Sequence, residues 1–218
     1  MKWLPVVLTI SICTVCSALT LPTGDVISDA AIEYTQYYEQ SQNIKKIIFK
    51  HPVKVTVLSS KVKVMYIGFY EDGNIEECRL SEDVEIKSHI GVINVMYRLL
   101  FYPNGTLSGC SLNTAKKVTT SAGQVIISDR VLFYDNGRIK ECIIDDSEIN
   151  SPSGNFTVYD ELRFHDNGSL SVCRLKSDTV IEDDTYEADS IIGWDTGGNF
   201  LGIMQWDYSQ DKYISEGN

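Results

Sequence analysis

Four cysteines recur at an almost constant spacing, and thiols are among the side chains best able to do chemistry. Cys78, Cys110, Cys142 and Cys173 are separated by 32, 32 and 31 residues. In an exported chain, such thiols could pair as disulfides, or they could coordinate a metal ion. Both reactions depend on how far apart the fold holds neighbouring cysteines.

Two architectures give opposite answers for these cysteines. If each unit supplies two or more antiparallel strands, equivalent residues lie about 10 Å or more apart, and a disulfide needs Cα atoms within about 7 Å. If each unit is one coil of a β-solenoid, equivalent residues lie about 4.8 Å apart and disulfides could form. We favour the first architecture, in which the cysteines are unpaired, half-buried, small hydrophobic residues. They lack the close Cys or His neighbours of zinc sites, so we predict no metal and no cofactor.

The three histidines, His51, His89 and His165, lie in no recognisable catalytic motif. The sequence contains no Gly-x-Ser-x-Gly, His-Glu-x-x-His or phosphate-loop pattern. We therefore predict that the protein has no catalytic residues and is not an enzyme. A secreted hydrolase that uses carboxylates is an alternative, although no pair of acidic residues is singled out by its spacing.

A row of aromatic residues is the best sequence candidate for a binding surface. Tyr70, Tyr102 and Tyr134 each follow a phenylalanine, and His165 takes the same position in a fourth segment. Neighbouring residues of a strand point to opposite faces, so these four side chains should lie opposite the phenylalanines. Exposed tyrosines are favourable interface residues. The competing interpretation is that both faces are partly covered and the tyrosines only pack there.

All these residues belong to four similar segments. The segments are Phe69–Leu80, Phe101–Leu112, Phe133–Ile144 and Phe164–Leu175. Each contains an aromatic residue, a turn with a glycine, an aliphatic residue and a cysteine. The turn glycines are Gly73, Gly105, Gly137 and Gly168. A fixed period of about 30 residues is typical of stacked arrays rather than of compact enzyme folds.

Each segment is predicted to be a β-hairpin. In the second, Pro103 presets the first turn position, Asn104 suits the next and Gly105 takes φ > 0, which gives a type I turn with a glycine bulge. We prefer this turn to a two-residue type I′ turn, and it places Phe101 opposite Leu107. The predicted core residues are Phe69, Phe101, Phe133, Phe164, Trp194, Cys78, Cys110, Cys142 and Cys173. Shorter stretches such as 83–86 and 117–120 predict a third strand in each unit.

The array divides the chain into four predicted regions. These are a signal peptide over 1–18, a mobile lead-in over 19–37, the array over 38–208 and a frayed tail over 209–218. The lead-in is expected to contain a short helix over Asp29–Tyr38. The array holds five to six units, and its degenerate end units begin at Tyr38, which we align with Phe69, and at Trp194.

The first residues of the chain are typical of an export signal. Lys2 precedes an apolar run over Trp3–Val15, and Cys16–Ala18 are small residues suited to cleavage after Ala18. The run is shorter than a membrane span, so we predict a protein that is not transmembrane. Lipid attachment at Cys13 or Cys16 is the alternative. In both cases the predicted location is secreted or in the cell envelope.

The net charge of −11 argues against two classes of partner. Polyanions require clustered Lys and Arg, and the chain has only short pairs such as Lys45–Lys46 and Lys116–Lys117. We therefore predict that the protein binds neither nucleic acid nor anionic lipid. Its partner should be a protein or a glycan.

The unit Phe-Tyr-x-Asn-Gly-x-Leu-x-x-Cys resembles the bacterial MORN-like repeat found in exported proteins. The resemblance covers about residues 65–175. It implies hairpins that build an elongated, curved antiparallel sheet with a scaffolding or interaction role, and it implies no catalytic residues. Two features depart from the family pattern: the period is longer, and the trailing glycine is replaced by cysteine except near Gly109.

The predicted fold is thus an all-β, elongated antiparallel β-hairpin repeat array, with a β-solenoid of one coil per repeat as the alternative. The predicted function is a non-enzymatic interaction or scaffold module that binds a protein or a glycan on the face of the array. The alternative is a structural secreted protein that self-associates through its sheet edges.

Overall fold

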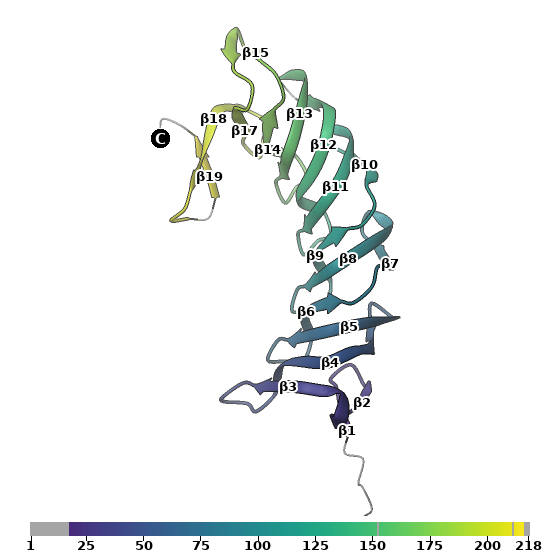
Figure 1. Ribbon diagram of the computed structural model, residues 1–218. Coiled ribbons are helices and arrows are strands. Elements are labelled where there is room, and N and C mark those ends of the chain that lie inside the picture. Colours follow the sequence, from purple (N-terminus) through teal and green to yellow (C-terminus); the bar gives the residue numbers. More distant parts are fainter. Residues whose placement is uncertain (1–17, 152, 211, 216–218) are drawn as a thin grey trace, which may run out of the picture.

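The structure of the protein is a computed structural model that describes residues 18–215, apart from 152 and 211. Residues 1–17 of the predicted signal peptide, with Cys13 and Cys16, lie outside the described residues, and its last residue, Ala18, begins β1 (Ala18–Thr20). Apart from one 3-10 turn, η1 (Asp29–Ala31), the regular structure of the described chain consists of β-strands. Figure 1 shows these strands following one another along an elongated, curved sheet.

Fifteen strands form one antiparallel sheet that is open at both ends. Its main path contains β3 (Ile32–Tyr37), β4 (Ile44–Val57), β5 (Ser60–Phe69), β6 (Ile75–Leu80), β8 (Gly91–Phe101), β9 (Leu107–Leu112), β11 (Gly123–Phe133), β12 (Ile139–Ser151), β13 (Gly154–Phe164), β14 (Leu170–Leu175), β17 (Ile191–Trp194), β18 (Phe200–Asp207) and β19 (Lys212–Ser215). The antiparallel hairpin array is therefore confirmed. The solenoid alternative is wrong, because stacked coils of a β-helix pair in parallel.

Six shorter strands lie beside this path. The strands β7 (Val84–Ser88) and β10 (Lys116–Thr120) pair with β8 and β11. Two separate pairs are β1 (Ala18–Thr20) with β2 (Val26–Ser28), and β15 (Thr179–Ile181) with β16 (Asp184–Tyr186). The predicted third strand of each unit is thus present as β7 and β10. In the next unit it continues β12, because residues 147–151 of that strand pair with β13.

The hairpin turns have the predicted geometry. The amide of Gly105 donates to the carbonyl of Tyr102 at 2.8 Å, and Gly105 has a φ of +80°. Phe101 pairs with Leu107, as the type I turn with a glycine bulge requires. The same offset recurs in the pairs Phe69 with Ile75, Phe133 with Ile139, Phe164 with Leu170 and Trp194 with Phe200.

This register predicts an energetic coupling between Phe133, which is fully buried, and Ile139, which packs against the core. A double-mutant cycle to alanine should give a coupling energy of about 0.5–1 kcal/mol, because the two side chains face each other across the hairpin. Urea denaturation of the two single variants and the double variant measures it. A control cycle of Phe133 with Ile75, two hairpins away, should be additive. Additivity in both cycles would contradict the contact.

Each long strand changes register near its middle. The shifts in β8 and β11 fall between Met96 and Leu99 and between Ile127 and Val131. Such bulges bend a strand and increase its twist. The two halves of a strand can then pair with different neighbours: the first half of β8 pairs with β7 and the second half with β6.

The core is one continuous cluster along the array. The five hairpin aromatics are all buried, and the four cysteines are at most 3 % exposed. Successive cysteines are separated by one intervening strand; Cys78 and Cys110, for example, both pair with Leu99. Two strand spacings are about 10 Å, which is beyond disulfide reach. The cysteines are accordingly free, as predicted, and they are fully buried rather than half-buried.

The region before the array is built differently from our expectation. The helix expected over 29–38 is wrong beyond η1, because Ile32–Tyr37 form β3. Asp25 fixes this region to the sheet: it accepts hydrogen bonds from the amide and hydroxyl of Thr56 and pairs with Lys61. Burial alone would raise the pKa of Asp25, but these partners outweigh burial and lower the pKa to about 2.

Both ends of the array also differ in detail. Tyr37, not Tyr38, takes the place of Phe69, since Tyr37 pairs with Ile44 as Phe69 pairs with Ile75. Our alignment of the first degenerate unit is therefore wrong by one residue at its aromatic. The spacing of 31 is confirmed on the second strand, where Ile47 takes the place of Cys78, since both pair with Ile67. At the other end, Trp194 takes the predicted place. Within the predicted tail, residues 212–215 form β19, which pairs with β18.

Candidate functional site

The predicted aromatic row lies along the turns, where each side chain contacts the next hairpin. The hydroxyls of Tyr70, Tyr102 and Tyr134 donate to the carbonyls of Phe101, Phe133 and Phe164 at 2.7–2.9 Å. At one end of the row the hydroxyl of Tyr38 contacts the carbonyl of Phe69, and at the other Nε2 of His165 lies 2.8 Å from the carbonyl of Trp194. The row therefore forms a ladder that joins successive hairpins.

The ladder explains why strand alternation is a poor guide for these tyrosines. Phe69 and Phe101 are the last residues of their strands, so Tyr70 and Tyr102 already belong to the turns. Burial raises the pKa of Tyr70, Tyr102 and Tyr134, which keeps their hydroxyls neutral donors. Their rings are partly exposed. Binding by this row stays a prediction, and the hydroxyl groups are already occupied.

Asparagines of the turns add a second set of contacts. The Nδ2 atoms of Asn136 and Asn167 donate to the carbonyls of Asp166 and Thr196, at 3.0 and 3.1 Å. The turn glycines Gly73, Gly105, Gly137 and Gly168 all have positive φ. The turns after Phe164 and Trp194 are thus held by their own geometry and by the turn before them.

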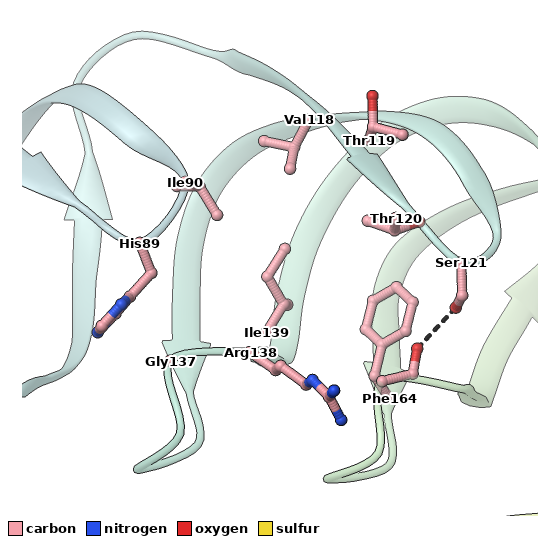
Figure 2. A pocket seen from close by; sticks show the side chains of 11 residues that line it. His89, Ile90, Val118, Thr119, Thr120, Ser121, Gly137, Arg138, Ile139 and Phe164 are labelled. Atoms are coloured by element: carbon pink, nitrogen blue, oxygen red, sulfur yellow. Dashed lines mark hydrogen bonds between the residues drawn. The ribbon is translucent and has the colours of Figure 1, made fainter.

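A cavity lies between two of these turns and the strand β10. Its volume is about 450 Å³, within the usual range for ligand pockets. Figure 2 shows that three loops and β10 enclose it: the β7–β8 turn, the turn before β12, and the turn after Phe164. We call it the β10 pocket. Its lining is His89, Ile90, Val118, Thr119, Thr120, Ser121, Gly137, Arg138, Ile139, Phe164 and Gly168.

The β10 pocket combines aliphatic walls with polar side chains. Ile90, Val118 and Ile139 are partly buried and pack against the core, and Phe164 below them is 4 % exposed. The hydroxyl of Thr120 donates to the carbonyl of Gly123 at 3.1 Å. These walls leave an apolar surface that is open to solvent.

One hydrogen bond ties β10 to a distant turn. The hydroxyl of Ser121 donates to the carbonyl of Gly168 at 2.7 Å, across 47 residues of sequence (Figure 2). On the other side, the ring of His89 packs over the backbone of Gly137 and edge-on against Phe133, with ring centres 5.6 Å apart. The pocket is therefore preformed by contacts between units.

Charged residues on the opposite sheet face neutralise one another. The side chain of Glu141 is 7 % exposed and pairs with Arg130 and Arg163. The guanidinium of Arg163 lies 4.6 Å from the ring of Trp206 and 4.9 Å from that of Tyr213, so the β18–β19 hairpin packs over it. The role of this charged network is to stabilise the fold, so the β10 pocket is the better candidate for a binding site.

This pocket could not be predicted from the sequence. In the sequence, His89 belongs to no recognisable motif, and neither do Ile90, Ser121 and Arg138. No local pattern marks them, because the contacts that join them depend on how the units curve past one another.

The described residues contain neither a cluster of metal-ligating side chains nor a helix that could span a membrane. Within residues 18–215 as described, no group of three or more His, Cys, Asp or Glu side chains could hold a metal ion. In the same part of the chain, no helix has the length and hydropathy to cross a bilayer.

Comparisons with known proteins do not assign the chain to a family. No protein-family model, no curated protein and no solved structure matches it. The fold class and the chemistry of the pocket are therefore the basis from which the function can be inferred.

Proposed function

We propose that this protein is a non-enzymatic, exported interaction module that binds a protein partner through the β10 pocket. An apolar side chain of the partner enters the pocket, and the hairpin array holds the pocket rigid. The observation that carries the proposal is a preformed, solvent-open cavity with aliphatic walls at Ile90, Val118 and Ile139. Clefts of this kind bury apolar groups favourably, at about 25 cal/mol per Å² of apolar surface.

The same lining favours a protein over a glycan. A sugar brings many hydroxyls, and burying them without hydrogen bonds is costly. In the pocket, the hydroxyls of Thr120 and Ser121 already donate to backbone carbonyls. Phe164, the phenylalanine of the lining, is almost fully buried and offers no exposed ring face for stacking.

We also propose that the protein is exported and that its hairpin unit is related to the MORN-like repeat. Export is supported by the apolar run that follows Lys2 and by the small residues before Leu19. The unit is a long-period variant of the MORN-like repeat, a proposal supported by the aromatic, turn-glycine and aliphatic positions and by the open sheet of sequential hairpins. An interaction role accords with that resemblance.

A pocket-filling variant tests the proposed function. Peptides selected from a phage-displayed random library against the mature chain should bind in solution, and Ile90→Trp should weaken that binding at least tenfold by occupying the cavity. Val180→Trp, at a β15 position that is 66 % exposed and outside the pocket, is the matched control and should bind normally. Isothermal titration measures both.

Other results would reject the proposal. Selected peptides that bind Ile90→Trp as tightly as the natural chain would place binding elsewhere. A library that yields no binder, together with a glycan array that does, would replace the protein partner by a glycan.

A further inference from the structure

We infer that the partner segment is an acidic peptide: an apolar side chain enters the β10 pocket, and a carboxylate one or two residues away binds Arg138. This inference rests on the proposed function and names the chemistry of its ligand. The juxtaposition that carries it is a cation at the rim of an apolar cavity in a strongly acidic protein.

Arg138 has unused hydrogen-bonding capacity. Its Nη1 atom donates to the carbonyl of Asp166 at 3.1 Å, and the side chain is exposed. Among the described residues, no carboxylate lies within ion-pair distance of its guanidinium. A guanidinium has five N–H donors in a planar fork, so donors remain for a bidentate contact with an incoming carboxylate.

The position of Arg138 suits such a contact. Its Cδ atom lies 3.5 Å from the place where a Cβ on Gly168 would stand, so the arginine stem lies along that turn. Figure 2 shows the guanidinium beside Phe164, at the rim of the cavity. A ligand whose apolar side chain fills the cavity would therefore bring its neighbouring residues past this charge.

The charge around the pocket limits how acidic the partner segment can be. No Asp or Glu lines the cavity, although the chain as a whole carries a net charge of −11. The pocket is thus a local exception on an acidic protein, and a segment rich in carboxylates would be repelled by the surrounding surface. One or two carboxylates beside the apolar residue match this distribution best.

Selection with a charge-reversed pocket provides the first test. The same random peptide library is selected against the natural chain, Arg138→Glu and Lys54→Glu. Lys54 is exposed on β4, outside the pocket, so its variant carries the same change of charge. The natural chain and Lys54→Glu should enrich an apolar residue with Asp or Glu nearby, whereas Arg138→Glu should enrich Lys or Arg at the acidic position.

Titration of one selected peptide gives the second test. Arg138→Glu should lower the affinity for the acidic peptide about tenfold or more, as the loss of a close interfacial charge pair does. The same variant should lower the affinity for an Asp→Asn or Glu→Gln version of that peptide less than threefold. Arg138→Gln should act in the same direction, and unchanged melting temperatures confirm that the variants fold.

The outcomes separate the inference from the proposed function. Loss of binding in Ile90→Trp with no effect of Arg138→Glu would overturn the inference and leave the pocket as the binding site. Enriched peptides without an acidic position would overturn it as well. Binding that neither variant affects would overturn the proposed function itself.

Discussion

Replacement of Gly137 by valine should lower the free energy of unfolding by about 2–4 kcal/mol, which is the largest effect we expect from one substitution in a turn. Gly137 has a φ of +82°, a conformation that costs an L-residue about 1–2 kcal/mol and a β-branched residue more. A Cβ would also stand 2.5 Å from Nδ1 of His89. The ring of His89 would have to leave its place against Phe133.

Gly105 provides the matched control. It has almost the same φ, +80°, but a Cβ there would meet nothing within 4 Å. The loss of unfolding free energy in Gly105→Val should therefore reflect the backbone cost alone. Urea denaturation should find Gly137→Val less stable than Gly105→Val by about 1 kcal/mol. Equal losses would mean that His89 moves aside freely. No loss in either variant would reject the turn.

The free energy of unfolding should also fall steeply above about pH 9, because the folded protein keeps four thiols neutral. Burial raises the pKa of Cys78, Cys110 and Cys142 to about 12, and it raises the pKa of Cys173 as well. In the unfolded chain the thiols ionise near pH 8.5. Each thiol thus contributes stability that is fully present below about pH 8.5 and is lost as the pH rises towards 12, at about 1 kcal/mol per pH unit.

Alanine at position 142 isolates one of these thiols. Cys142→Ala should cost about 1–2 kcal/mol at pH 7, because it removes buried volume. Between pH 9 and 10, however, the unfolding free energy of Cys142→Ala should fall by about 1 kcal/mol less than that of the natural chain. This difference corresponds to the ionisation of one thiol. Tyrosines with raised pKa values act in the same direction, but equally in both proteins. Urea titrations at pH 7, 8.5, 9 and 10 measure the slopes, and parallel declines would contradict the assignment.

The sequence predicts the hairpins well, because each hairpin is specified by adjacent residues. The spacing from Phe101 to Leu107, with glycine at 105, determines one turn and therefore one register. The recurrence of that spacing determines the order of strands along the sheet. The helix expected over 29–38 fails because pairing with β4 outweighs local preference there.

The candidate site lies beyond such reasoning. Ser121 and Gly168 meet across 47 residues, and His89 meets Gly137 across a neighbouring unit. These contacts follow from the curvature of the sheet and from the bends within its strands, which no local pattern encodes. The tyrosine row was predicted in the right units, but the end of each strand at its phenylalanine turns the hydroxyls towards the next hairpin.

The tyrosine ladder makes the hairpins interchangeable. On one side, each hairpin donates a hydrogen bond from its tyrosine hydroxyl. On the other side, the carbonyl of its phenylalanine accepts one, so its two boundaries are complementary to any other hairpin of the series. Loss of residues 101–132, one full period, would bring Tyr70 against the carbonyl of Phe133 with the same chemistry. The number of units can therefore change by in-frame duplication or deletion of whole units. The sheet would become longer or shorter, and the hydrogen bonds between hairpins would stay of the same kind.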